Sequence, residues 1–251
     1  MTTQSILILL VAGFLGGVAN SMAGGASLIT FPAMMAAGLA PIPANASNTV
    51  ALIFGNVMGA WTEKQQLPAL DPSLWTAFAV AALGGALGAV LLLNTPETVF
   101  VMVVPVLIGC ATAIFAYSKA IQSWVAKRGA GEGQNLRAAL LFPASIYGGY
   151  FGAGMGVIFM AVLSATSAWA LRSANAVKNI LGALANGAAI VVFVVQGVVS
   201  WPQTLVMMGA CLVGGFVGGK ALGIVSASAM KNAIITIGAV MTLFYAWRYW
   251  F

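Results

Sequence analysis

The sequence predicts an all-α polytopic membrane protein made of two inverted repeats of about five helical segments each. Three observations predict it. First, 61% of the 251 residues are hydrophobic and only 6% are charged, whereas soluble domains carry about 25% charged residues. Second, apolar runs recur along the whole chain, each close to the length of about 20 residues that a helix needs to span a bilayer. Third, the two halves of the chain match each other in sequence.

Ten apolar segments follow one another, separated by polar or glycine-containing breaks. The first half contains segments 5–20, 25–39, 45–61, 73–93 and 97–118. The second half contains segments 138–152, 155–171, 176–199, 203–222 and 229–249. Short segments of strictly alternating polarity, which transmembrane β-strands require, are absent from the sequence. Each apolar segment is therefore expected to form a helix.

One long polar stretch divides the chain. Residues 119–137 contain Lys119, Lys127, Arg128 and Arg137 against the single acidic residue Glu132. Because Lys and Arg concentrate in cytoplasmic loops, we expect a solvated, basic, cytoplasmic linker here. It would separate an N-terminal transmembrane repeat, residues 1–118, from a C-terminal transmembrane repeat, residues 138–251. The N-terminus lacks the basic start of a secretory signal, so the first segment is expected to be retained.

A shift of the chain by 130 residues aligns residue types that are scarce in this composition. The aligned pairs are Gly24–Gly154, Asn45–Asn175, Asn56–Asn186, Gln66–Gln196 and Pro72–Pro202, and Gly84, Gly85 and Gly88 align with Gly214, Gly215 and Gly218. The matches of Asn, Gln and Pro are the informative ones, because Ala, Leu and Gly match by chance in a chain of this composition. An internal duplication follows.

Charge predicts that the two copies are inverted. The turns that hold Arg172, Lys178, Lys220 and Lys231 fall on the same side as the basic linker, as does the charged turn 62–72. The turns at 40–48, 94–97 and 196–203 carry one acidic residue in total and fall on the other side. Corresponding turns of the two copies thus differ in charge, as an odd number of crossings per copy requires. Inverted repeats are typical of transporters with a site at the membrane midplane.

Both copies interrupt their first segment pair at matching positions. The interruptions read "NSMAGGAS" at 20–27 and "YFGAGMG" at 150–156. Lipid cannot satisfy the backbone groups that a break frees, so we expect broken or re-entrant first helices covered by protein. A helix that begins inside the membrane presents unpaired N–H groups and a partial positive charge, which attract anions. The breaks therefore predict an anion site.

The candidate substrate-binding residues come from the two breaks and from two polar clusters at 41–50 and 172–181. They are Asn20, Ser21, Gly24, Gly25, Ser27, Asn45, Asn48, Gly152, Gly154, Gly156, Asn175, Lys178 and Asn179. Lys178 would attract an anion, or it marks the cytoplasmic side. Two further explanations stay open. Glycine pairs such as Gly84/Gly88 permit close helix packing, and helix capping explains Asn45 and Asn175 equally well.

Two stretches resemble known signatures of the sulfite exporter TauE/SafE family. "GFLGGVANSMAGGASLITFPAMMAAGLAPIPANASNTVA" (13–51) is similar to the N-terminal signature, and "YGGYFGAGMGVIFMAVL" (147–163) is similar to the second-half signature. Two departures stand out: Gly24-Gly25-Ala26-Ser27 replaces a four-glycine run, and Ser47-Asn48-Thr49 lacks the lysine of a Thr-Asn-Lys element. The resemblance implies a permease of the bacterial cytoplasmic (inner) membrane that moves sulfite or organosulfonates, often outward.

The residue inventory excludes several classes of function. The chain has no histidine, and its four acidic residues lie in predicted turns or at span ends, so no catalytic constellation, metal site or cofactor site can be assembled in the membrane. An enzyme is not expected. The net charge of +6 lies at the ends of apolar runs, which does not indicate a nucleic-acid partner. The expected partners are a small anionic substrate and the lipid bilayer, and a homodimer is left open.

We therefore expect a transporter that exports sulfite or an organosulfonate through a midplane site lined by helix N-termini and Asn and Ser side chains. An anion leaving a cell with a negative interior gains about 2.3 kcal/mol per charge per 100 mV, so export needs no coupling ion. An anion channel and a proton-coupled carrier or importer of another small anion are the alternatives.

Overall fold

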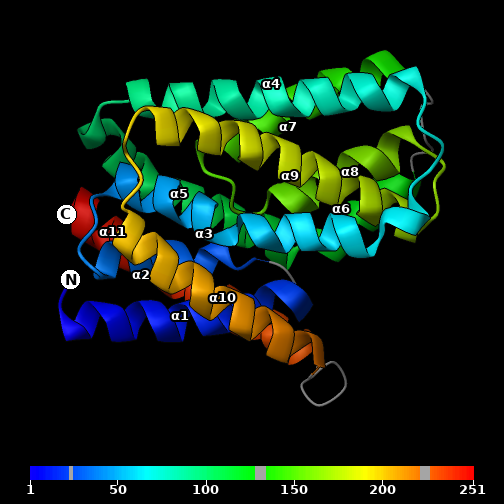
Figure 1. The fold of residues 1–251 in the computed structure, drawn as a ribbon. Helices are drawn as coiled ribbons and strands as arrows, with labels where there is room; N and C mark the ends of the chain where they lie inside the picture. The colour runs from blue at the N-terminus through cyan, green and yellow to red at the C-terminus, as the bar shows by residue number, and fades with distance from the viewer. Residues whose placement is uncertain (23–24, 128–133, 221–226) are drawn as a thin grey trace.

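The computed structural model describes residues 1–251 except 23–24, 128–133 and 221–226 (Figure 1). The described residues form α-helices and one 3₁₀ helix, without β-strands. The helices are α1 (Thr3–Met22), α2 (Ser27–Ala36), α3 (Pro41–Thr62), η1 (Lys64–Gln66), α4 (Pro72–Asn94), α5 (Glu97–Ala116), α6 (Ser118–Lys127), α7 (Gln134–Tyr150), α8 (Met155–Thr166), α9 (Leu171–Val195), α10 (Trp201–Lys220) and α11 (Ala227–Trp250). All ten predicted apolar segments are confirmed as helices, and helix α6 occupies part of the predicted linker.

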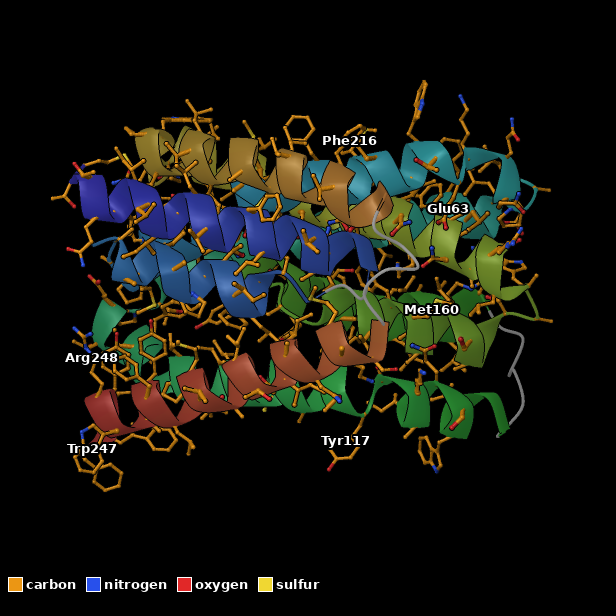
Figure 2. The ribbon with its side chains drawn as sticks, turned by 90° about the horizontal axis from the view of Figure 1, so that it is seen from below. Glu63, Tyr117, Met160, Phe216, Trp247 and Arg248 are labelled. Carbon is orange, nitrogen blue, oxygen red and sulfur yellow. The ribbon has the colours of Figure 1, made fainter. Side chains whose placement is uncertain are left out.

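The outside of the bundle is apolar. Among the described residues, six helices are long and apolar enough to cross a membrane: Thr3–Ser21, Pro72–Asn94, Glu97–Ala116, Leu171–Val195, Trp201–Gly219 and Ser228–Trp250. Leu83, Met102 and Leu243 are each more than half exposed, and Tyr117 and Trp247 project away from the bundle (Figure 2). Such a continuous apolar surface is stable only in lipid. The protein is thus an all-helical, multi-pass membrane protein.

The first two helices of each half form a hairpin. Ser5 Oγ donates to Ala37 O at 3.2 Å, so the start of α1 lies beside the end of α2. Arg137 donates to Thr166 O at 3.0 Å, which joins the start of α7 to the end of α8. The second arms, α2 and α8, have 10 and 12 residues, a length of roughly 15–18 Å. That is about half of a 30 Å hydrocarbon core, so the second arm of each hairpin is too short to cross it.

Corresponding helices of the two halves pack antiparallel. The contacting pairs are Glu63–Asn175, Gly59–Asn179 and Asn56–Gly182 between the chain at α3 and helix α9, and Met102–Trp250, Gly109–Thr242 and Thr112–Gly238 between α5 and α11. In each set the residue number rises on one helix as it falls on the other. This packing supports the predicted inversion of the two copies, and their orientation in a membrane stays a prediction.

The most extensive helix contacts join α1 to α10 and α4 to α7. The first helix of each half therefore packs on the other half. Glycine allows the close approach: a Cβ atom at Gly17 would overlap Cys211 O, and a Cβ atom at Gly149 would overlap Gly85 O. Small residues at helix crossings in membranes permit such contact, and the packing explanation is confirmed for Gly88, where a Cβ atom would overlap Ile146 O.

Candidate functional site

The second-half break lies between α7 and α8. Helix α7 ends at Tyr150 and α8 begins at Met155. Between them Gly152 and Gly154 have φ angles of +78° and +80°, a conformation that glycine adopts without strain. The predicted interruption at 150–156 is therefore present, and glycine is required at two of its positions.

The first-half break has the same form where it is described. Helix α1 ends at Met22 and α2 begins at Ser27. Gly25 has a φ angle of +80°, the same as that of Gly154. The 130-residue shift places Gly25 at position 155, one residue after Gly154. Gly24, a predicted site residue, lies outside the described residues.

The two breaks lie against the same stretch of α5. A Cβ atom at Gly25 would lie 3.2 Å from the ring of Phe115, and one at Gly154 would lie 3.6 Å from Ala111 O. Residues Ala111 and Phe115 are one helical turn apart. The fold therefore brings the two breaks together inside the bundle, although they lie in different halves of the sequence.

Two asparagines of α3 are buried next to these breaks. Asn45 is 1% exposed and donates from Nδ2 to Tyr150 O, the last carbonyl of α7, at 2.9 Å. Asn48 accepts a hydrogen bond of 2.6 Å from Thr30 of α2. The capping explanation for Asn45 is wrong, because α3 begins after Ala40 and Asn45 lies within the helix. The Oδ1 atom of Asn45 is buried without a hydrogen-bond partner among the described residues, so it can accept from a ligand or water.

A second polar cluster surrounds Glu63, directly after α3. Asn175 Nδ2 donates to both carboxylate oxygens of Glu63 at 2.7 Å, and Asn179 Nδ2 donates to Oε2 at 3.0 Å. Lys178 Nζ donates to Asn175 Oδ1 at 2.6 Å. A carboxylate, two amides and an ammonium group are thus connected by hydrogen bonds across α3 and α9.

The first turn of α8 lies beside Lys178. A Cβ atom at Gly156 would lie 3.8 Å from Cδ of Lys178. Gly156 is exposed, and within the described ranges its N–H has no hydrogen-bond partner, while the N–H groups of Val157 and Ile158 both reach Gly154 O. The lysine side chain therefore packs beside a helix N-terminus that holds a free backbone donor. All three attract an anion, and the carboxylate of Glu63 partly offsets them.

The predicted residues at the end of α1 have other contacts. Asn20 and Ser21 are exposed. The amide of Asn20 lies against Gly55 of α3, and Ser21 Oγ donates to Val18 O at 2.9 Å within its own helix. Ser27 is half-buried at the start of α2. Of this group, Ser27 is the one that begins a helix at the break.

Sequence reasoning did not include Glu63 and Thr30 among the site residues. The spacing of Asn175 and Asn179, four positions apart on one helical face, is a signal for a shared partner. The capping explanation for Asn175 is wrong as well, because the residue that precedes α9 is Ala170. The partner of both amides, Glu63, was expected at a span end, where it does lie.

Comparison with known proteins matches nearly the whole chain to one protein family and to membrane proteins. The family model described as "Sulfite exporter TauE/SafE" matches residues 9–245. The chain is 25% identical over 243 residues to "Probable membrane transporter protein YfcA" of Escherichia coli K12, which covers 94% of this chain and 87% of that protein.

Two further relatives have similar names. The chain is 24% identical over 245 residues to "Probable membrane transporter protein" of Haemophilus influenzae, covering 94% of this chain and 92% of the relative. It is 26% identical over 246 residues to "Probable membrane transporter protein ORF9" of Sinorhizobium sp, covering 95% and 91%. No solved structure matches the chain.

Proposed function

Because the chain belongs to the sulfite exporter TauE/SafE family and is a membrane transporter, we propose that it exports a small sulfur-containing anion, sulfite or an organosulfonate, from the bacterial cytoplasm. The observation that carries this proposal is the packing of the Lys178 side chain beside Gly156 in the first turn of α8, where the Gly156 N–H has no partner within the described ranges. Both groups are donors with positive character, so they favour an oxyanion over a cation or a neutral solute.

The neighbouring groups suit an oxyanion with several oxygens. The buried amides of Asn45 and Asn48 lie beside the same breaks, and amide side chains supply both donors and acceptors. The glycines of the breaks leave the backbone open to close approach. Interrupted helices in both halves, with breaks that lie near each other inside the bundle, are typical of alternating-access transporters with a midplane site.

The direction of transport and its driving force are inferred from the basic residues of the protein and from the charge of the substrate. We propose that the end of the bundle at which α4, α7 and α9 begin is cytoplasmic, because Lys64, Arg137 and Arg172 lie at that end and basic residues concentrate on the cytoplasmic side. Moving a monovalent anion outward from an interior at −100 mV releases about 2.3 kcal/mol. Export is therefore driven by the membrane potential without a coupling ion.

Purified protein in proteoliposomes tests this proposal. With methanesulfonate, whose charge is fixed, an imposed potential of 100 mV should sustain a steady-state concentration ratio of about 50-fold. A pH gradient without a potential should sustain none. Unlabelled substrate on the opposite side should accelerate flux through a carrier and leave flux through a channel unchanged. Strict dependence on the pH gradient, with no response to voltage, would contradict the proposal.

One observation favours the proton-coupled alternative. Glu63 is half-buried and accepts three hydrogen bonds from Asn175 and Asn179, and a buried carboxylate is the usual proton carrier in membrane transporters. If transport is proton-coupled, Glu63→Gln should abolish the response of flux to a pH gradient while a response to voltage persists. If the proposal is correct, neither the native protein nor the variant responds to a pH gradient in the same vesicles.

A further inference from the structure

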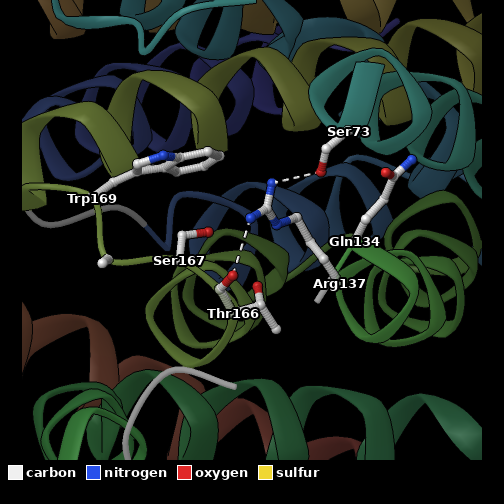
Figure 3. A pocket seen from close by; sticks show the side chains of 7 residues that line it. Ser73, Gln134, Arg137, Thr166, Ser167 and Trp169 are labelled. Atoms are coloured by element: carbon white, nitrogen blue, oxygen red, sulfur yellow. Dashed lines mark hydrogen bonds between the residues drawn. The ribbon is translucent and has the colours of Figure 1, made fainter. Parts of the chain in front are cut away.

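A polar cavity lies away from the breaks, at the end of the bundle where α4 and α7 begin. Its volume is about 390 Å³, and it is lined by Ser73 of α4, Gln134 and Arg137 of α7, and the segment Thr166–Trp169 that joins α8 to α9 (Figure 3). An adjoining cavity of about 320 Å³ shares Ser167, Ala168 and Trp169 and is otherwise lined mainly by apolar side chains.

Arg137 is the central group of the polar cavity. Sequence reasoning placed it in a solvated linker, but its side chain is only 8% exposed because it lies in the first turn of α7 beneath the α8–α9 connection. It donates to Ser73 Oγ at 3.1 Å and to Thr166 O at 3.0 Å, and its guanidinium lies 4.6 Å from the ring centroid of Trp169. All these partners are neutral.

Among the described residues, no carboxylate forms an ion pair with Arg137. Asp71 acts on it electrostatically, but no ion pair joins the two in the described part of the chain, and Asp71 Oδ1 accepts from the N–H of Leu74 at 2.8 Å. A buried guanidinium is costly unless it is paired with an anion. An anion bound in the cavity would provide that pairing for Arg137.

Two buried polar atoms at the cavity lack hydrogen-bond partners among the described residues. They are Nε of Arg137 and Oγ of Ser167, and both residues are 8% exposed. Buried polar groups are nearly always paired. An oxyanion in the cavity would supply acceptors for both, and a guanidinium is well suited to bind sulfate-type and phosphate-type oxygens.

We propose that this cavity is a binding site for a tetrahedral oxyanion of the sulfate or phosphate type, with Arg137 as its charged ligand and Ser167 as a second donor. The oxyanion is either free in solution or the head group of an anionic lipid. The lipid source is included because the site lies at the end of the bundle and opens beside an apolar cavity. This site is separate from the proposed transport site and does not depend on which anion is exported.

Thermal unfolding of the full chain tests the site, since a ligand that binds the folded state raises Tm. One arm titrates sodium sulfate against sodium chloride at equal ionic strength in neutral detergent. The other arm compares nanodiscs of neutral lipid with nanodiscs that contain phosphatidylglycerol. Arg137→Gln should raise the half-saturating concentration at least about tenfold, because a charge-assisted hydrogen bond is lost. Ser167→Ala breaks no existing bond and should raise it severalfold.

The controls separate this site from general charge effects and from the transport site. Arg248→Gln makes the same change in charge at the opposite end of the molecule (Figure 2) and should respond as the native protein does. The same titrations are repeated in a Lys178→Gln background. Because this change removes the cation of the proposed transport site, a remaining response that depends on Arg137 belongs to the cavity.

Each outcome decides the proposal. A response to sulfate that Ser167→Ala or Arg137→Gln weakens supports a site for a free oxyanion. A response that appears only with phosphatidylglycerol and is weakened in the same way supports a site for a lipid head group. If the native protein responds to neither probe, or if Arg137→Gln and Ser167→Ala both respond as the native protein does, the site does not exist. Should Arg137→Gln fail to fold, Ser167→Ala alone decides.

Discussion

Replacement of Gly149 by alanine is expected to destabilise the protein by about 3 kcal/mol or more, since overpacking of this kind costs 1–3 kcal/mol even where side chains can move. Gly149 is buried in α7, and a Cβ atom there would overlap the carbonyl oxygen of Gly85 in α4. The obstacle is backbone inside a helix, which cannot change rotamer. The α4–α7 contact would therefore have to separate.

The measurement is the thermal unfolding midpoint in detergent, together with the monodisperse fraction after size-exclusion chromatography. Gly187→Ala and Gly209→Ala are matched controls: both glycines are helical and no heavy atom lies within 4 Å of an added Cβ. These variants should be unchanged or more stable by up to about 1 kcal/mol, from helix propensity. A Gly149→Ala protein with the native midpoint would show that α4 and α7 do not pack as described.

Lys178→Gln is expected to lower kcat/KM for sulfite by about 10- to 100-fold, the range that corresponds to one lost charge-assisted hydrogen bond. Lys178 is the cation beside the first turn of α8. Glutamine keeps a donor near Asn175 but removes the charge. The loss should affect flux in proteoliposomes far more than the unfolding midpoint.

Lys64→Gln is the matched control for charge. Lys64 is exposed, and its ammonium lies 3.9 Å from the ring centroid of Trp61, away from the hydrogen bonds of the Glu63 cluster. Flux through this variant should equal native flux. If Lys178→Gln transports sulfite at the native rate, the start of α8 is not the binding site, and the anion must bind elsewhere along the breaks.

The helices were predictable because hydropathy and length are local properties. The two breaks were predictable for the same reason, since glycine and polar residues interrupt apolar runs there. Partners across helices were not: the bonds of Glu63 to Asn175 and Asn179 connect residues 112 and 116 positions apart, and they depend on how α3 crosses α9. The burial of Arg137 was missed because a basic residue after a polar stretch is typical of a solvated loop.

The partnership of α1 with α10 has a consequence for biosynthesis. After α1 is made, residues 23–200 must follow before α10 begins, a delay of roughly 10–40 s at 5–20 residues per second. During that time the glycine-lined face of α1 has no permanent neighbour, so lipid or the insertion machinery must cover it. Helix α1 consequently enters the bilayer long before its main partner is made.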